Sequence, residues 1–229
     1  MNDEAQMQQP ETSSSAMIRT LAGIAMLSGF LVVLTFQLTK PYIEENQRVA
    51  IEKAVFEVVP GAVQKINFEV QPGKLQQWIK GAKGTQIYAG YDAEGNLKGI
   101  AANASAVGYA GAIYFLYGYD PSCECIRGLK VLKMAETPGL GDKIITDANF
   151  VANFNALDAR LNEDKSRLTN AIVTVKAGTK KNPWEIDAIS GATISSDAAG
   201  KALNTSAQVL LPMLMPHIEV IKQAGGREF

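Results

Sequence analysis

The sequence has little of the two residue types on which most protein metal sites depend. Its 229 residues include one His and two Cys, and these do not have the spacing of a zinc site. A Ser-His-Asp triad would have to use His217, near the C-terminus, and we consider that arrangement unfavourable. The sequence therefore predicts no metal site and no catalytic residue of its own.

An excess of positive charge is also missing. Lys and Arg number 22 against 23 Asp and Glu, so the formal net charge is −1. Nucleic-acid binding leaves a footprint of clustered basic residues, and no basic face is evident along the chain. We therefore expect no nucleic-acid partner.

One long segment lacks charge altogether. Thr20–Thr39 contains no ionisable residue, and twenty helical residues at about 1.5 Å each span about 30 Å, the thickness of a bilayer core. A cleaved signal peptide is the alternative. The preceding polar tail, residues 1–16, has three acids and no Lys or Arg, which favours a retained anchor. We predict a transmembrane helix over residues 17–39, placed in a lipid bilayer.

The remainder of the chain is long enough for one globular domain. An amphipathic juxtamembrane helix is expected over residues 40–62, ending at Pro-Gly-Ala, and a globular domain over residues 63–229. Strands followed by helices without strict alternation predict an α+β fold with mixed, largely antiparallel sheets. The expected strands are 85–92, 96–105, 111–120, 126–134 and 170–178, with a hairpin turn at 92–96, and the expected helices are 147–161 and 196–221.

Three glycine-rich segments could carry chemistry. They are Gly108–Gly111, Glu136–Ile144 and Asp187–Ala198. Glycines spaced in this way let a backbone approach a flat or phosphorylated ligand and expose N–H donors. Each segment alone is equally compatible with an ordinary turn.

The third segment has a more specific interpretation. Thr193 lies at an expected helix start, where free N–H groups and the helix dipole favour an anion. A phosphate could be stabilised there without Lys or Arg, and a hydroxyl at that position could be esterified to it. The simpler alternative is that Thr193 or Ser195 only caps the helix.

Together these motifs resemble the FMN-binding family, which includes the G subunit of the Rnf electron transport complex and the C subunit of the sodium-pumping NADH:quinone oxidoreductase. The resemblance covers nearly the whole chain, and its most specific element is Asp-x-x-Ser-Gly-Ala-Thr. It implies that a flavin transferase attaches FMN covalently to Thr193 through a phosphoester. The motif residues here are Asp187, Ser190, Gly191, Ala192 and Thr193.

The family pattern also implies flavin contacts outside this motif. It assigns them to the segment Glu-Thr-Pro-Gly-Leu-Gly and, more weakly, to the strand entry Gly-Tyr-Ala-Gly. The segment Gly139–Ile144 looks like the version found in the Rnf member of the family. The expected contacts are Glu136, Thr137, Gly139, Leu140, Gly141, Tyr109 and Gly111.

By this resemblance the chain is an electron-transfer subunit of an ion-translocating ferredoxin:NAD oxidoreductase. The sequence offers no dinucleotide fingerprint, no acid–base cluster and too few Cys for its own iron–sulfur cluster, which favours a relay subunit. Its partners would be the membrane flavin and iron–sulfur subunits. The expected site is a bacterial inner membrane, with the N-terminus cytoplasmic and the domain periplasmic. The alternatives are the C subunit of the sodium pump or a non-catalytic anchored assembly module.

The two Cys lie at a departure from the family pattern. Asp120–Gly128 replaces the Asn/Gly loop that the family usually has there. Cys123 and Cys125 could form a labile disulfide, remain free thiols at a partner interface, or be plain surface residues. The sequence leaves all three open.

Overall fold

One long helix, α1 (Ser14–Val58), begins the described part of the chain. The computed structural model describes residues 13–79 and 81–225, and its contacts divide the chain into two units between Val49 and Ala50. The apolar part of α1 is entirely exposed within the structure, and its length and composition suit a membrane span. This helix is therefore a candidate transmembrane segment. Most of the expected polar tail, residues 1–12, lies outside the described residues.

The expected transmembrane and juxtamembrane helices form one element in the structure. Pro41 lies inside α1, where its missing N–H removes a single backbone hydrogen bond. The helix ends at Val58, two residues before the Pro-Gly-Ala segment, where Gly61 takes a positive φ of 84°. That left-handed conformation suits glycine and turns the chain into the first strand.

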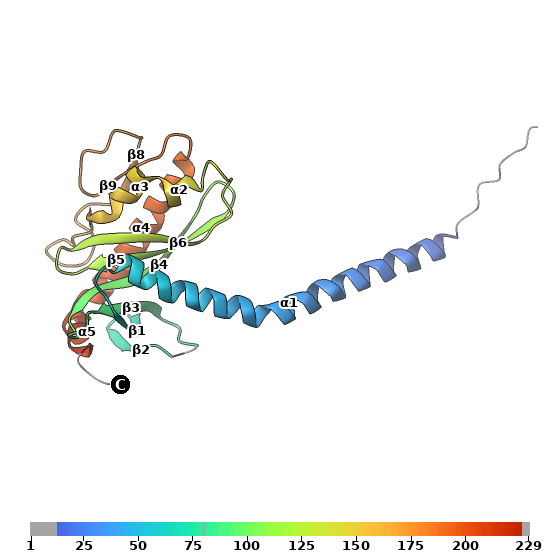
Figure 1. The fold of residues 1–229 in the computed structure, drawn as a ribbon, viewed down its shortest axis with the longest axis horizontal. Coiled ribbons are helices and arrows are strands. Elements are labelled where there is room, and N and C mark those ends of the chain that lie inside the picture. The colour runs from blue at the N-terminus through green and yellow to red at the C-terminus, as the bar shows by residue number, and fades with distance from the viewer. Residues whose placement is uncertain (1–12, 80, 226–229) are drawn as a thin grey trace, which may run out of the picture. The chain divides into compact units, whose positions relative to one another are not determined.

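A seven-stranded antiparallel sheet, counted over the described residues, forms the centre of the second unit (Figure 1). Its order is β2-β1-β3-β4-β5-β6-β7, so most neighbours in space are neighbours in sequence. The strands are β1 (Gln64–Gln71), β2 (Lys74–Gln77), β3 (Thr85–Tyr91), β4 (Leu97–Val107), β5 (Ala112–Asp120), β6 (Cys125–Lys133) and β7 (Leu157–Asp158).

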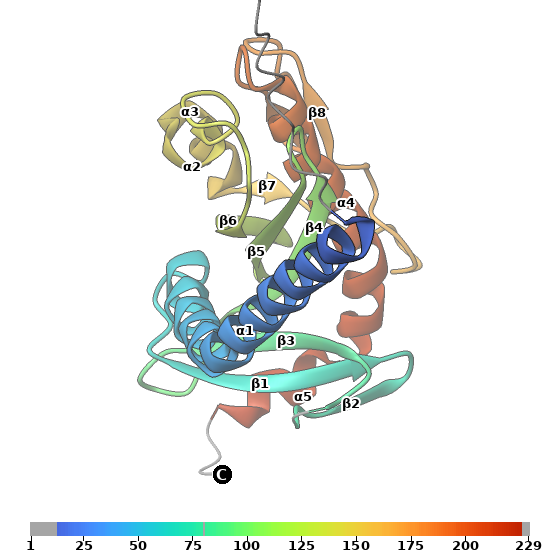
Figure 2. The same ribbon diagram turned by 90° about the vertical axis from the view of Figure 1, so that its right-hand side faces the viewer.

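The helices and a small second sheet complete this unit. The short parallel pair β8 (Val173–Val175) and β9 (Glu185–Asp187) leads into α4 (Thr193–Leu214). Figure 2 shows α2 and α3 beside β7, and α5 near β1. Their bounds are α2 (Lys143–Thr146), α3 (Ala148–Ala152) and α5 (Ile218–Ala224), with 3-10 turns η1 (Asn153–Asn155) and η2 (Met215–His217).

Alternation along the strands gives the sheet two buried faces. In β5, Phe115 and Tyr117 belong to the main core under α4, whereas Leu116 belongs to a smaller cluster with the end of α1. Successive side chains of a strand point to opposite faces, so both helices bury apolar surface against the same strand. The sheet is therefore the middle layer between α4 and the last turns of α1.

Glycine allows the end of α1 to approach the sheet closely. A Cβ at Gly118 of β5 would overlap the carbonyl oxygen of Val58. On the neighbouring strand, a Cβ at Gly128 would lie 2.8 Å from Val58 Cα. In both cases the obstacle is backbone, which cannot rotate away as a side chain can.

The predicted α+β class with largely antiparallel sheets is confirmed, and so are the four central strands and the turn at 92–96. The prediction of a helix over 147–161 is largely wrong. Helical structure there is limited to α3 and the 3-10 turn η1, because Asn153 donates to the Asp187 carbonyl at 3.2 Å and Leu157 pairs with Ile126 of β6. Strands β1 and β2 were not expected. The prolines at 212 and 216 predict breaks or kinks in the C-terminal helix. The helix is interrupted at η2, which contains Pro216, whereas Pro212 lies inside the continuous helix α4.

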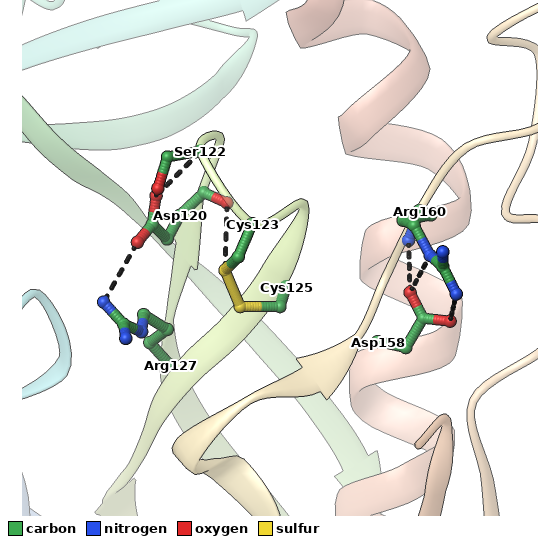
Figure 3. The surroundings of a disulfide bond; sticks show 7 residues. All are labelled: Asp120, Ser122, Cys123, Cys125, Arg127, Asp158 and Arg160. Atoms are coloured by element: carbon green, nitrogen blue, oxygen red, sulfur yellow. Dashed lines mark hydrogen bonds and ion pairs between the residues drawn. A yellow bond between two sulfur atoms is a disulfide. The ribbon is translucent and has the colours of Figure 1, made fainter. Parts of the chain in front are cut away.

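The tight β5–β6 turn holds the two cysteines. Cys123 and Cys125 form a disulfide, with Cα atoms 5.2 Å apart (Figure 3). Of the three possibilities that the sequence left open, the structure therefore has the disulfide.

The close approach of α1 predicts the effect of a single methyl group. Gly118→Ala should lower the free energy of unfolding by about 1–3 kcal/mol, because the new Cβ overlaps backbone. Denaturant unfolding of the detergent-solubilised chain, followed by far-UV circular dichroism, measures it. Gly111→Ala is the control, since its Cβ would meet nothing within 4 Å. Equal stability of the two variants would contradict this account of the α1–sheet contact.

Candidate functional site

Three segments that are far apart in sequence enclose one cavity of about 540 Å³. They are the β4–β5 loop, the loop before α2, and the start of α4. Each contains one of the three glycine-rich motifs, so the fold brings all three motifs together. The lining residues are Tyr109, Glu136, Thr137, Leu140, Gly141, Gly191, Ala192, Thr193, Ile194 and Ser195.

A buried carboxylate joins the three segments. Glu136, 7% exposed, accepts hydrogen bonds from Ser195 Oγ at 2.5 Å and from Ala110 N at 3.0 Å. The glycines around it leave room for the carboxylate: a Cβ at Gly108 would lie 2.6 Å from Glu136 Oε1, and one at Gly141 would lie 2.5 Å from Oε2. The glycines at 108 and 141 are thus explained by the space that Glu136 occupies, whereas a Cβ at Gly111 or Gly139 would meet nothing within 4 Å.

Opposing effects set the ionisation of this group. Burial raises the pKa of Glu136, whereas hydrogen bonds from Ser195 and from the backbone of Ala110 and Tyr109 lower it. The net result is a pKa below the ordinary value for Glu. Glu136 is therefore an anion at neutral pH, stabilised by donors from both of the other segments, the β4–β5 loop and the start of α4.

The start of α4 leaves donors available. Its N-cap residue is Ala192, which has no side-chain oxygen and makes no capping bond. The preceding turn is closed by Ser196, whose Oγ donates to Ala192 O at 2.9 Å and accepts from Ile189 N at 3.1 Å. The uncapped N-terminus of a 22-residue helix is a favourable position for an anion.

Thr193 lies at this helix start with an exposed side chain. The residue before Ala192 is Gly191, whose φ is 83°, a conformation that favours glycine. The Ser195 and Ser196 side chains are buried and hydrogen-bonded, so Thr193 is the accessible hydroxyl of the first helical turn. It combines access from the cavity with proximity to the helix N-terminus.

Asp187 has a different position from the rest of its motif. Its carboxylate accepts from Gly178 N at 3.0 Å and from Thr179 N at 3.2 Å, in the loop that joins β8 to β9. Asn153 holds its backbone, accepting from Asp187 N at 3.0 Å. These bonds fix the position of the segment that leads into α4. Asp187 therefore helps to position the cavity wall without lining the cavity itself.

The expected site residues divide into two groups. Most of them line the cavity, whereas Gly139 forms a turn with a φ of 77° and Gly111 accepts a hydrogen bond from Gly108 N at 2.7 Å. The lining residues that the sequence interpretation did not include are Ile194 and Ser195. Ser195 could have been found only by knowing its partner, Glu136, which lies 59 positions away. The expected residues outside the lining are Asp187, Ser190, Gly139 and Gly111.

The cavity can hold a flat cofactor with a phosphate. The volume lies within the range of small-molecule sites, and no Lys or Arg occurs among the lining residues of the described chain. A phosphate would therefore depend on the uncapped N–H groups of α4. The donor set thus suits a cofactor whose phosphate lies at the start of α4.

Comparisons with known proteins agree with this geometry. The model of the FMN-binding domain family matches residues 108–208, which contain every lining residue of the cavity. The G subunit of the ion-translocating oxidoreductase complex of Methanosarcina acetivorans is 30% identical over 189 residues, covering 82% of this chain and 90% of its own. The chain belongs to this family of FMN-binding G subunits. The resemblance inferred from the motifs is therefore confirmed.

Two further relatives extend the comparison. The G subunit of the Na⁺-translocating ferredoxin:NAD⁺ oxidoreductase complex of Acetobacterium woodii is 37% identical over 102 residues, 44% of each chain. The crystal structure of NqrC from Shewanella oneidensis superposes with a TM-score of 0.55 at 20% identity, covering 75% of this chain and 88% of the other. Because the two sequences are only 20% identical, this structural likeness supports the fold alone.

The ionised Glu136 predicts a pH-dependent stability difference. Glu136→Gln should lower the free energy of unfolding by roughly 1–3 kcal/mol at neutral pH, because a charged hydrogen-bond acceptor is lost. A carboxyl group whose pKa is lowered by folding stabilises above its unfolded pKa and loses that contribution as pH falls through its folded pKa. The difference between wild type and variant should therefore shrink in acid.

Denaturant unfolding at a series of pH values measures this difference. Glu94→Gln, in the exposed β3–β4 turn, is the matched control and should differ from wild type by less than about 0.5 kcal/mol. A difference for Glu136→Gln that stays constant from neutral to acid pH would show that its carboxylate is not the stabilising form.

Proposed function

We propose that this protein is the electron-transfer subunit of a membrane-bound ion-translocating ferredoxin:NAD oxidoreductase, and that it carries FMN on Thr193 through a phosphoester. The observation that carries the proposal is the exposed Thr193 hydroxyl at an uncapped helix start, inside the cavity that the FMN-binding match covers. The family membership supports the membrane complex, and the cavity supports the cofactor site.

The helix N-terminus supports attachment through the phosphate. A phosphodiester on Thr193 keeps one negative charge, which the first-turn N–H groups and the dipole of α4 would stabilise. Gly191 has no side chain to obstruct the approach of the phosphate.

Exposed apolar side chains around the cavity support a place for the flavin ring. Tyr109 is 73% exposed, Leu140 51% and Ile194 52%, although all three line the cavity. A flat ring against them would bury apolar surface on both partners, which is favourable. The ring would remain close enough to the surface to exchange electrons with a partner subunit.

FMN, when bound, supplies the transfer of electrons singly or in pairs, and so can link iron–sulfur centres to two-electron carriers. The chain's own residues position and retain it. A phosphoester prevents loss of the cofactor by dissociation, while Glu136 holds together the three segments that form its walls. This division of work suits a relay subunit with partner flavin and iron–sulfur subunits.

We further propose that the domain faces the periplasm of a bacterial inner membrane, with the N-terminus of the chain in the cytoplasm. Two features support this side. Disulfides persist mainly in oxidising compartments, and Cys123 is joined to Cys125. A covalent tether suits a compartment with little free FMN. A flavin transferase on the same side would then modify Thr193.

The proposed attachment predicts a mass change at one residue. Full-length protein produced together with a flavin transferase should gain FMN less one water, located on the peptide that contains Thr193. Thr193→Ala should lose the addition and the in-gel flavin fluorescence completely, because no hydroxyl remains to form the ester. Intact-mass and peptide mass spectrometry measure both results.

Two matched variants sharpen that experiment. Thr193→Ser keeps a hydroxyl and should retain flavin, and Ser190→Ala should also retain it, since Ser190 lies outside the cavity lining. Covalent flavin on the Thr193→Ala protein would contradict the assignment. Colourless wild-type protein, despite an active transferase, would favour the assembly module.

The partner proposal predicts which proteins accompany the native chain. Affinity purification from solubilised native membranes should recover ferredoxin:NAD oxidoreductase subunits with iron–sulfur clusters, identified by mass spectrometry and cluster absorption. A variant truncated after Val49, which removes the domain, should recover fewer of them. Recovery of quinone reductase subunits instead would identify a sodium-pump component.

A further inference from the structure

The disulfide in the β5–β6 turn is unusual in how little chain it encloses. Cys123 and Cys125 are separated by a single residue, so the bond closes a very short loop. The stabilisation that a disulfide provides by restricting the unfolded chain grows with loop length and is smallest for such a loop. A purely structural role therefore explains this bond poorly.

The turn is held by other interactions that do not involve sulfur. The Asp120 carboxylate accepts from Ser122 N at 2.8 Å and from Arg127 Nη1 at 3.2 Å (Figure 3). The Glu124 carbonyl accepts from Ala159 N at 3.0 Å. These bonds tie the turn to its own base and to the chain after β7.

The ladder also fixes the second cysteine. Cys125 pairs with Asp120 of β5 on one side and with Asp158 of β7 on the other. The Asp158 carboxylate is in turn bound to Arg160 Nε at 2.8 Å (Figure 3). Because Cys125 is placed by backbone pairing on both sides, its sulfur stays near that of Cys123 whether or not the bond exists.

The two sulfur-bearing residues differ in access. Cys123 is exposed, whereas Cys125 is only 4% exposed. The Cys123 Sγ also lies 3.7 Å from the Asp120 carbonyl oxygen, which would accept a hydrogen bond from the Cys123 thiol in the reduced state. Exposed disulfides are the ones that react with external thiols.

We propose that Cys123 and Cys125 are a redox-active pair that exchanges with an external dithiol and keeps the hairpin fold in both states. The thiolate of the dithiol attacks Cys123 Sγ, the disulfide breaks, and Cys125 leaves as a thiolate that takes up a proton. The second thiol of the dithiol then attacks the dithiol sulfur of the mixed disulfide. Cys123 leaves as a thiolate and takes up a proton. Two electrons and two protons pass to the pair, and the dithiol becomes a disulfide.

The dithiol that reacts with this disulfide does so at a place separate from the proposed flavin site. The cavity lies at the β4–β5 loop, and the disulfide lies at the opposite end of β5. Nine strand residues at about 3.4 Å each separate the two ends by roughly 30 Å. This inference is thus independent of the proposed flavin chemistry.

Thiol titration of the full-length chain in detergent, without denaturant, tests the proposal. In a large excess of reduced over oxidised glutathione, both cysteines should become available to an alkylating reagent counted by mass. A structural disulfide would stay closed under those conditions. Reduction should lower the Tm of the domain by no more than about 6 °C, because the closed loop is so short.

Two single variants identify the reacting sulfur. With oxidised glutathione, Cys125→Ser should gain one glutathione less two hydrogens on Cys123, and lose it again on adding dithiothreitol. Cys123→Ser should lose this reaction in the folded protein and recover it only in guanidinium, since Cys125 is buried. A wild-type disulfide that opens only after unfolding, or equal reaction of the two variants, would overturn the proposal.

Discussion

The cavity depends on one buried carboxylate. Glu136 accepts hydrogen bonds from the β4–β5 loop and from the first turn of α4, while itself belonging to the loop before α2. Its burial would be unfavourable without those donors, so the three segments must meet for the charge to be accommodated. The glycines at 108 and 141 follow from the same requirement, because any side chain there would occupy the space of the carboxylate. The buried carboxylate and the two glycines are therefore required together.

Local chemistry determined which strands the sequence could predict. Strands β3 to β6 consist of β-branched and aromatic runs bounded by glycine and aspartate, which is a strong local signal. Strand β1 also has a local signal, because Ile66, Phe68 and Val70 alternate with polar residues, so a strand could have been predicted there. What the sequence does not reveal is the burial of Glu69, which is 1% exposed and accepts from Gln71 and Gln76 side chains. The helix expected after α3 failed because Asn153 forms its decisive bonds with β9. Tertiary partners outweighed local propensity there.

The candidate site shows the same division. The motif around Thr193 could be interpreted from sequence, because a helix start with an accessible hydroxyl is a local feature. The convergence of the three glycine-rich segments could be expected only from the family resemblance, since nothing local connects positions 109, 136 and 193. Asp187 belongs to the most specific motif, yet its carboxylate holds the β8–β9 loop. Membership of a motif thus does not by itself establish contact with a ligand.

The seating of Val58 against Gly118 and Gly128 makes the last turns of α1 part of the domain. These turns are packed into the smaller hydrophobic cluster, where Val55 and Val58 are buried against the sheet. Residues 50–58 of the helix therefore belong to the same compact unit as the sheet, whereas the apolar part of α1 belongs to the other unit. A shortened version of the domain has to keep these turns, because without them one apolar face of the sheet would be exposed to water.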